Sequence, residues 1–399
     1  MLELYYRFIR FSLGVYEGME FLEGAALRGF DWKKLYAFSV NRKLVGVVME
    51  GISKLPKEVA PDGALLMKWF AESQKIRRQN VTMNKVTAGV YNKVVAAGFR
   101  CCILKGQGNS LMYPEPQVRM SGDVDVWVEA TREEVRRIAV MLAKDNGGVG
   151  EESLNHIVLK VDGIAVELHS TPAILNNPVH NYRLQLWLRR NADQQFCNLV
   201  TLPDVGEPVA VPTNTFNVVY QLFHLYHHYF YEGVGLRQVI DYYFVIRNYE
   251  EEFRNYELGV RISESNNSKS QAKPRTIPDS KLLIPNSLKR FGLYSFAGAV
   301  MYVLHEVMGL SENSMIVPMD ERRGRMLLDE VLRGGNFGQY ADRRPHTNGF
   351  ISHNLQRLQR DLRLLRFYPQ EALPEPFYRL WHWCWRKNPS SPSHRCQSL

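Results

Sequence analysis

The chain has 399 residues, and a prior of about 150 residues per domain predicts two or three domains. Hydrophobic residues at 45% and charged residues at 23% are typical of globular proteins, which excludes wholesale disorder, a collagenous repeat and a coiled-coil rod. The formal net charge is +9, and residues 321–399 hold +7 of it, because fourteen Lys and Arg stand there against seven Asp and Glu. We therefore expect a near-neutral protein with a basic C-terminal part.

Cysteine spacing and hydropathy bear on the compartment of the protein. Its five cysteines show no C-x-x-C spacing, so neither a disulfide framework nor a zinc ribbon is predicted. Charged residues interrupt the N-terminal segment before an apolar run of signal-peptide length, and the longest apolar stretch, 296–304, is far shorter than the ~20 residues of a membrane span. We expect a cytoplasmic protein without a membrane span, and the sequence leaves its oligomeric state open.

In chain order, the first predicted region is helical and covers residues 1–89. Its clearest helix runs from about Ser73 to Ala97, where apolar residues recur at helical spacing and Gly98 follows at the position of a C-cap. A mixed α/β core is then predicted for residues 90–205.

Two short segments at the start of that core predict strands. The apolar run Phe99–Leu104 predicts a buried strand, and the period-two alternation of Asp123–Val128 predicts a half-buried one. A charged amphipathic helix is expected from Thr131 to about Lys144, since Thr131 and Glu134 have the spacing of a capping box.

The sharpest turn signal is the dipeptide Asp162-Gly163 between the apolar-rich runs 156–161 and 164–168. Asp-Gly at this place favours a two-residue type I′ turn, so we predict a β-hairpin. The stretch that follows, to about Pro212, is mixed and supports no assignment.

A second helical region is predicted for residues 206–399. Thr213 is a plausible N-cap, and two helices joined at Gly233–Gly235 are expected to reach about Tyr249. Residues 262–280 are polar and broken by prolines, so we expect a long loop or a disordered insert there. Helical patterning returns from 286 to about 368, the tail from 389 on is expected to fray, and no internal repeat is visible.

Three acidic residues in the predicted core point to metal binding. Asp123 and Asp125 are two residues apart on a predicted strand, so both carboxylates project from the same face of the sheet. Such a pair repels itself unless a cation lies between, and Mg²⁺ prefers carboxylate oxygens supplemented by water and phosphate. Glu167, on another predicted strand, offers a third carboxylate.

Cationic and glycine residues near these acids fit the binding of phosphate. Lys105 and Gly106 lie where a strand ends and a helix is expected to begin, and glycine lets backbone N–H groups approach a phosphate closely. Gly122 removes side-chain bulk beside the carboxylates, and Arg119 is placed to reach phosphate oxygens. Anion-binding groups beside cation-binding groups predict a site for a metal–nucleoside triphosphate.

These motifs resemble the nucleotidyltransferase superfamily with a polymerase-β-like catalytic core. The order L-K-G, Y-P, R-x-x-G-D-x-D and E-L-H is similar to that of a bacterial group of uncharacterised nucleotidyltransferases; in this chain the elements are Leu104–Gly106, Tyr113-Pro114, Arg119–Asp125 and Glu167–His169.

The segments His224–His228 and Gly235–Asp241 resemble the helical portion of that group, and the resemblance covers about residues 75–245. One departure is Gln107, since the superfamily places Gly or Ser after the first glycine.

The resemblance implies an α+β fold, with a short mixed sheet and helices flanked by N- and C-terminal helical regions. It also implies an enzyme that transfers a nucleoside monophosphate from an NTP, with ATP expected, to an unidentified small molecule, protein or RNA, releasing pyrophosphate. By the resemblance, Asp123, Asp125 and Glu167 are catalytic and hold two Mg²⁺ ions, with Mn²⁺ as the alternative, and the nucleotide is bound by Lys105, Gly106, Arg119 and Gly122.

Two alternatives to this function stay open. A catalytically idle member of the same fold would bind a nucleotide or a partner protein, because a fold alone does not determine function. An RNA-modifying transferase would use the basic C-terminal part and would bind RNA with a steep salt dependence.

Several other side chains have a functional and a structural interpretation. His224 and His228, four apart on a predicted helix, have zinc-ligand spacing, but no third ligand accompanies them and we favour a structural role. For His169, beside Glu167, a structural role is likewise favoured over a supporting role at the metal. Arg237 and Asp241 are expected to pair on an exposed helix.

The aromatic segment Trp381–Trp385, followed by basic residues, is typical of single-strand nucleic-acid binders. It also fits the apolar face of a terminal helix that packs on the rest of the protein, and we favour that interpretation.

Overall fold

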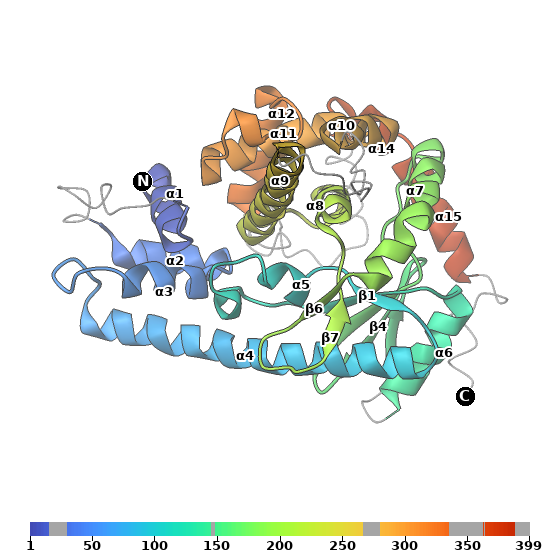
Figure 1. The fold of residues 1–399 in the computed structure, drawn as a ribbon, viewed down its shortest axis with the longest axis horizontal. Helices are drawn as coiled ribbons and strands as arrows, with labels where there is room; N and C mark the ends of the chain where they lie inside the picture. Colours follow the sequence, from blue (N-terminus) through green and yellow to red (C-terminus); the bar gives the residue numbers. More distant parts are fainter. Residues whose placement is uncertain (16–29, 145–147, 266–279, 335–361, 363, 388–399) are drawn as a thin grey trace.

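The computed structural model describes residues 1–15, 30–144, 148–265, 280–334, 362 and 364–387. Figure 1 shows a small sheet with helices on both sides, a long helix along one edge of the molecule and a cluster of C-terminal helices over the other. The predicted α+β class with a short mixed sheet is confirmed. The predicted division at residues 1–89, 90–205 and 206–399 stays a prediction, and one helix passes through its first boundary.

That helix is α4 (Gly63–Ala96), which follows the shorter helices α1 (Leu2–Ser12), α2 (Trp32–Asn41) and α3 (Val45–Ser53). It begins earlier than its apolar pattern indicates, because the Asp62 side chain accepts a hydrogen bond from the backbone N–H of Leu65 and caps it. It ends as predicted, since Gly98 takes a positive φ of 89° directly after the C-cap.

The sheet has the strand order β1-β2-β5-β4-β3. Its strands are β1 (Cys101–Ile103), β2 (Val124–Val128), β3 (Val149–Glu152), β4 (His156–Val161) and β5 (Ile164–His169). Only the β2–β5 pair is parallel, and the other three pairs are antiparallel.

The prediction that 123–128 is a half-buried strand is wrong. All five residues of β2 are buried, because β2 lies inside the sheet and both of its faces are covered.

The local turn and cap predictions are confirmed. Helix α6 (Arg132–Ala143) begins with a full capping box, in which Thr131 and Glu134 satisfy each other's backbone N–H groups. Asp162 and Gly163 both have positive φ angles, 50° and 78°, as a type I′ turn between β4 and β5 requires.

Several elements lie where the sequence supported no assignment. They are β3, the helix α7 (Pro178–Cys197), and a separate two-stranded sheet of β6 (Leu199–Thr201) and β7 (Pro208–Ala210). The strands β6 and β7 have three residues each, which is too short to show a clear alternation of polar and apolar residues.

The C-terminal part is helical, as predicted. The two helices expected from Thr213 are α8 (Asn214–Tyr231) and α9 (Leu236–Ser265), and the rest are α10 (Ser280–Arg290), α11 (Tyr294–Met308), the 3₁₀ turn η3 (Glu312–Ser314), α12 (Glu321–Gly334), α14 (Pro369–Ala372) and α15 (Glu375–Lys387). None of the described helices combines the length and apolarity needed to cross a bilayer.

Two predictions for this part need correction. The prediction of a loop that begins at Ile262 is wrong for its first four residues, because α9 continues to Ser265. The rest of that segment up to residue 279, and the tail from residue 389, lie outside the described residues. Of the aromatic segment expected to pack on the rest of the protein, Trp381 is 54% exposed on α15, and the side chains of Trp383 and Trp385 lie outside those that the structure describes.

The alternation of side chains along the strands decides what each face of the sheet carries. Valine, leucine and isoleucine side chains of β2, β4 and β5 point to α4 and α6 and form one apolar core with them. The other face of the same strands carries four polar residues, Asp125, His156, Glu167 and His169, toward the C-terminal helices.

Candidate active site

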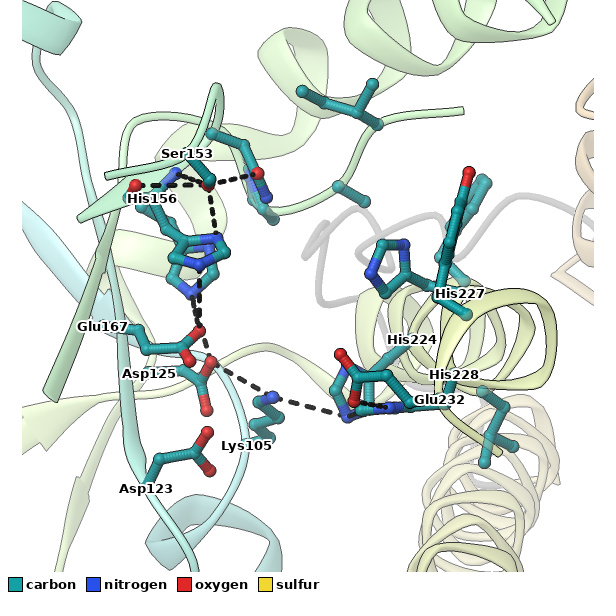
Figure 2. A pocket seen from close by; sticks show the side chains of 18 of the residues that line it. Lys105, Asp123, Asp125, Ser153, His156, Glu167, His224, His227, His228 and Glu232 are labelled. Carbon is teal, nitrogen blue, oxygen red and sulfur yellow. Dashed lines mark hydrogen bonds and ion pairs between the residues drawn. The ribbon is translucent and has the colours of Figure 1, made fainter. Parts of the chain in front are cut away.

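A cavity of about 1290 Å³ lies against that polar face. One wall is formed by β2, β4, β5 and the loops that lead to them, and the other by residues of α8, α9 and α15. Figure 2 shows the two sets of side chains facing each other, with Lys105 between them. Of the residues predicted from the sequence to form the site, all seven line this cavity: Lys105, Gly106, Arg119, Gly122, Asp123, Asp125 and Glu167.

The three predicted carboxylates come together. Parallel pairing of β2 with β5 places Asp125 directly beside Glu167, and Asp123 precedes β2 on the same side. One carboxylate oxygen from each of the three lies within 4.8 Å of the others. Asp125 is the most deeply buried of them, at 1% exposure.

Two cationic side chains contact these carboxylates. Lys105 Nζ lies 3.1 Å from Asp125 Oδ1. His169 Nε2 lies 3.1 Å from the same oxygen and 3.4 Å from Glu167 Oε2. Even with both cations counted, three carboxylates stand against two positive charges, so this wall carries a net negative charge.

The ionisation of these groups follows from their contacts. Burial lowers the pKa of Lys105, but Asp125 and the other carboxylates overcome that effect and raise it above its ordinary value. Burial also lowers the pKa of His169, yet its hydrogen bonds to Asp125 and Glu167 raise it to about 9. For Glu167, burial raises the pKa, and the bond from His169 with nearby positive charge brings it down to about 2.

The donor set fits a divalent cation. Asp125 Oδ2 is buried and has no hydrogen-bond partner within the described part of the chain, and a buried carboxylate oxygen without a partner is costly. Among the residues that the structure describes, the Asp123 carboxylate has no hydrogen bond or ion pair either. Oxygen atoms that lack protein partners and converge within 4.8 Å are what Mg²⁺ or Mn²⁺ would bind.

The two predicted glycines differ in how closely other atoms approach them. Gly106 has φ 61°, and a Cβ there would lie 3.3 Å from the carbonyl oxygen of Asp123. Gly122 lies under Arg237, whose guanidinium nitrogens would be 4.0 Å from an added Cβ. The residue that departs from the superfamily, Gln107, is buried and bonded to Asn84 and Ser121, so it points away from the cavity.

Arg119 is held by an ion pair at the end of the cavity. Its Nε and NH2 donate to the two carboxylate oxygens of Asp241 at 2.7 and 2.8 Å, and Tyr113 Oη donates to the same carboxylate at 2.7 Å. Burial raises the pKa of Asp241, but the Arg119 charge and hydrogen bond lower it overall. The remaining nitrogen of Arg119, NH1, has no hydrogen-bond partner.

The expected exposed pair of Arg237 and Asp241 is therefore wrong. Both residues are buried on α9, and Asp241 pairs with Arg119 from the β2 side of the cavity. Arg237 NH1 instead donates to the carbonyl oxygen of Met120 at 2.5 Å, next to the predicted nucleotide-binding residues.

The facing wall on α8 carries a hydrogen-bonded chain that ends at Lys105. Glu232 Oε2 lies 2.9 Å from His228 Nδ1, the Nε2 atoms of His228 and His224 are 2.9 Å apart, and Lys105 Nζ is 3.3 Å from His224 Nε2. Figure 2 shows this chain continuing through Lys105 to Asp125. Burial lowers the pKa of His224 well below its ordinary value, so His224 is neutral, and the single lone pair of its Nε2 faces both Lys105 and His228.

Glu232 and His156 are among the cavity residues that sequence reasoning missed. Glu232 follows α8 and shows no motif, so only the packing of α8 against the sheet brings it in. His156 could have been found, because the Asp162-Gly163 turn fixes the hairpin register that pairs it with His169. Burial and the nearby His169 charge lower the pKa of His156.

Comparison with known proteins agrees with this geometry. A sequence model of the family described as "Uncharacterised nucleotidyltransferase" matches residues 28–270. The chain belongs to this family. The match extends well beyond the segment of about 75–245 expected from the motifs, at both ends. It includes all seven predicted site residues and the helical wall on α8.

The chain was also compared with curated proteins and with solved structures. No curated protein and no solved structure matches the chain significantly. The family thus supports a general role in nucleotidyl transfer and an NTP as substrate, and the cavity shows an acidic group that could bind a metal ion.

Proposed function

We propose that this protein is a metal-dependent nucleotidyltransferase that moves a nucleoside monophosphate from an NTP, with ATP the first choice, to an acceptor and releases pyrophosphate. The observation that carries the proposal is the convergence of the Asp123, Asp125 and Glu167 oxygens within 4.8 Å in a cavity large enough for a nucleotide. Membership of the family supplies the reaction class.

The metal ions, Mg²⁺ or Mn²⁺, would be held by these three carboxylates and would neutralise triphosphate charge and activate the acceptor's attacking group. The chain's own residues position the reactants. Asp125 and Glu167 are held in place by neighbouring strands, and Lys105 contributes a positive charge beside them, within reach of a bound phosphate. Little covalent chemistry falls to the protein in such transfers, so this positioning is its main contribution.

Several features support the proposed phosphate contacts. Gly106 and Gly122 leave room beside the carboxylates, and the positive φ of Gly106 disfavours any other residue there. Arg119 lines the cavity, is fixed through two of its nitrogens and adds a positive charge there. Arg237, next to Gly122, adds a second guanidinium on the same side.

The test compares the wild-type chain with the double variant Asp123→Asn/Asp125→Asn. Pure protein is incubated with Mg²⁺, each labelled NTP in turn and cell extract as a source of acceptors, and label transfer and nucleotide binding are measured. We expect Mg²⁺-dependent transfer with wild type and its loss in the double variant. Asp329→Asn on α12, away from the cavity lining, is the matched control and should behave as wild type.

Other outcomes would overturn the enzyme or replace it with the idle alternative. Nucleotide binding that survives in the double variant, with no transfer by either protein, indicates a catalytically idle binding member of the fold. Wild-type protein that neither binds a nucleotide nor transfers label contradicts the proposal altogether.

A further inference from the structure

The geometry points to a second cation position, beside the carboxylate group, that selects a transition-metal ion such as Zn²⁺ through the imidazoles of His156 and His169 and the carboxylate of Glu167. The three ligand atoms lie within 4.8 Å of one another. This inference concerns metal binding alone and does not depend on nucleotidyl transfer.

The hairpin places the three side chains together. His156 on β4 is the direct partner of His169 on β5, and Glu167 lies two residues before His169 on the same face. Glu167 Oε2 is 3.4 Å from His169 Nε2 and 4.0 Å from His156 Nε2. Ligands at about 2.0–2.2 Å from a tetrahedral zinc lie roughly 3.3–3.5 Å apart, so only a small side-chain adjustment closes the site.

The hydrogen bonds around Ser153 orient His156 for this role. Ser153 Oγ is 3.0 Å from His156 Nδ1, and its hydroxyl hydrogen has acceptors in Asn155 Oδ1 and the carbonyl oxygen of His156, each at 3.2 Å. With that hydrogen donated to one of them, Oγ accepts the Nδ1–H of His156. The assigned tautomer leaves the Nε2 lone pair directed at Glu167, and an imidazole whose other nitrogen donates to an oxygen is the usual arrangement of a metal-ligating histidine.

A lone pair and a carboxylate oxygen that face each other at 4.0 Å cannot form a hydrogen bond between themselves. A cation between them resolves the contact, with the Nε2 proton of His169 released to solvent when the ion binds. The position that remains open on the ion faces the cavity, which both histidines line.

The donor atoms separate this position from the carboxylate one. Two imidazole nitrogens and one oxygen suit Zn²⁺ and its neighbours, whereas an all-oxygen group suits Mg²⁺. Glu167 belongs to both groups, Asp123 only to the oxygen group and His156 only to the nitrogen group. Substitution of these last two residues therefore distinguishes the positions.

The histidines on α8 are the competing place for zinc, and their geometry argues against it. The Nε2 atoms of His224 and His228 are 2.9 Å apart, which is a hydrogen bond and shorter than the spacing of two ligands on one zinc. His228 Nδ1 is also close to Glu232, at 2.9 Å. In the part of the chain that the structure describes, neither histidine belongs to a group of three or more convergent metal ligands.

The experiment titrates the metal-stripped full-length protein with Zn²⁺ in excess Mg²⁺ by calorimetry, and with Co²⁺ by visible absorption as a reporter of imidazole ligation. We expect wild type to bind one equivalent of Zn²⁺. His156→Ala should weaken that binding roughly 100-fold or more, while Asp123→Asn retains it. His227→Ala, a histidine on the opposite cavity wall, is the matched control and should bind as wild type.

A second substitution, His156→Gln, covers the case in which His156→Ala does not fold, and circular dichroism monitors folding for every variant. Wild type that binds no Zn²⁺, or a His156 variant that binds it as tightly as wild type, overturns the inference. So does loss of Zn²⁺ binding in Asp123→Asn, which would place the ion among the carboxylates. Mg²⁺-dependent nucleotide binding is measured on the same samples, so that failure here is distinguishable from failure of the proposed transferase.

Discussion

The two walls of the cavity differ in how their charged side chains are paired. On the sheet wall, carboxylates outnumber cations, and both Asp125 Oδ2 and the Asp123 carboxylate lack hydrogen-bond partners among the described residues. On the helix wall, the carboxylates of Asp241 and Glu232 each have a close basic neighbour, Arg119 and His228 respectively. The contrast indicates which charged groups have partners within the protein and which can bind a ligand. Removal of one partner of a buried ion pair is destabilising, whereas a buried carboxylate without a partner costs stability until a cation binds.

The largest effect on stability is expected for Asp241, on the helix wall. Asp241→Ala leaves the buried Arg119 guanidinium without its counter-charge, and removal of one partner of a buried ion pair costs about 3–5 kcal/mol. Urea denaturation of wild type and variant measures this loss in the free energy of unfolding. Asp241→Asn, which keeps the shape and one acceptor, should lose less. A loss below about 1 kcal/mol for Asp241→Ala would contradict the proposed difference between the two walls, because it is the value typical of an exposed ion pair.

A pH-dependent effect of somewhat smaller size is expected where α14 meets the loop after β5. Glu371 is buried and accepts the backbone N–H groups of Asn176 and Asn177; burial raises its pKa from 4.5 to about 7 in spite of these bonds. A carboxyl with a raised pKa binds more protons in the folded state, so its contribution is complete below pH 4.5 and is lost as pH rises through 7. The loss amounts to about 3 kcal/mol at most.

Unfolding by urea at a series of pH values from 5 to 8 measures this slope. Glu371→Gln should flatten it, because the amide does not ionise. If the pH dependence of the free energy of unfolding is unchanged in Glu371→Gln, that dependence comes from other groups and the prediction for Glu371 is wrong.

The smallest effect on stability is expected on the sheet wall. Asp123→Asn breaks no hydrogen bond or ion pair with the described residues and relieves repulsion from Asp125, so the free energy of unfolding in the absence of metal should change by no more than about 0.5 kcal/mol. The same variant should lose the rise in thermal midpoint that Mg²⁺ produces in wild type, because a ligand stabilises only the state that binds it. Strong destabilisation without metal would show that Asp123 serves the fold.

The sequence predicted the sheet wall well, and particular residues show why. The Asp162-Gly163 turn sets the register of β4 and β5, and alternation along β2 and β5 places Asp125 and Glu167 on one face. The capping box of Thr131 and Glu134 was likewise visible. Each of these signals extends over only a few residues, so it can be recognised without knowledge of the tertiary structure.

The helix wall was largely invisible. Arg119 and Asp241 are 122 residues apart, and Lys105 and His224 are 119 apart. Nothing local in the sequence indicates that they meet, and the helical spacing of Arg237 and Asp241 predicted the wrong partner.

By itself, the sequence indicated the family, through its resemblance to the nucleotidyltransferases, and it determined the three carboxylates and their common face, through period-two alternation and a two-residue turn. Only the tertiary structure decided which charges are paired, that β2 is buried on both faces, and that Glu232 at the end of α8 lines the cavity. The physical reason is that hydrogen bonds and ion pairs between distant segments depend on how helices pack against the sheet, and that packing is set by apolar burial over the whole chain.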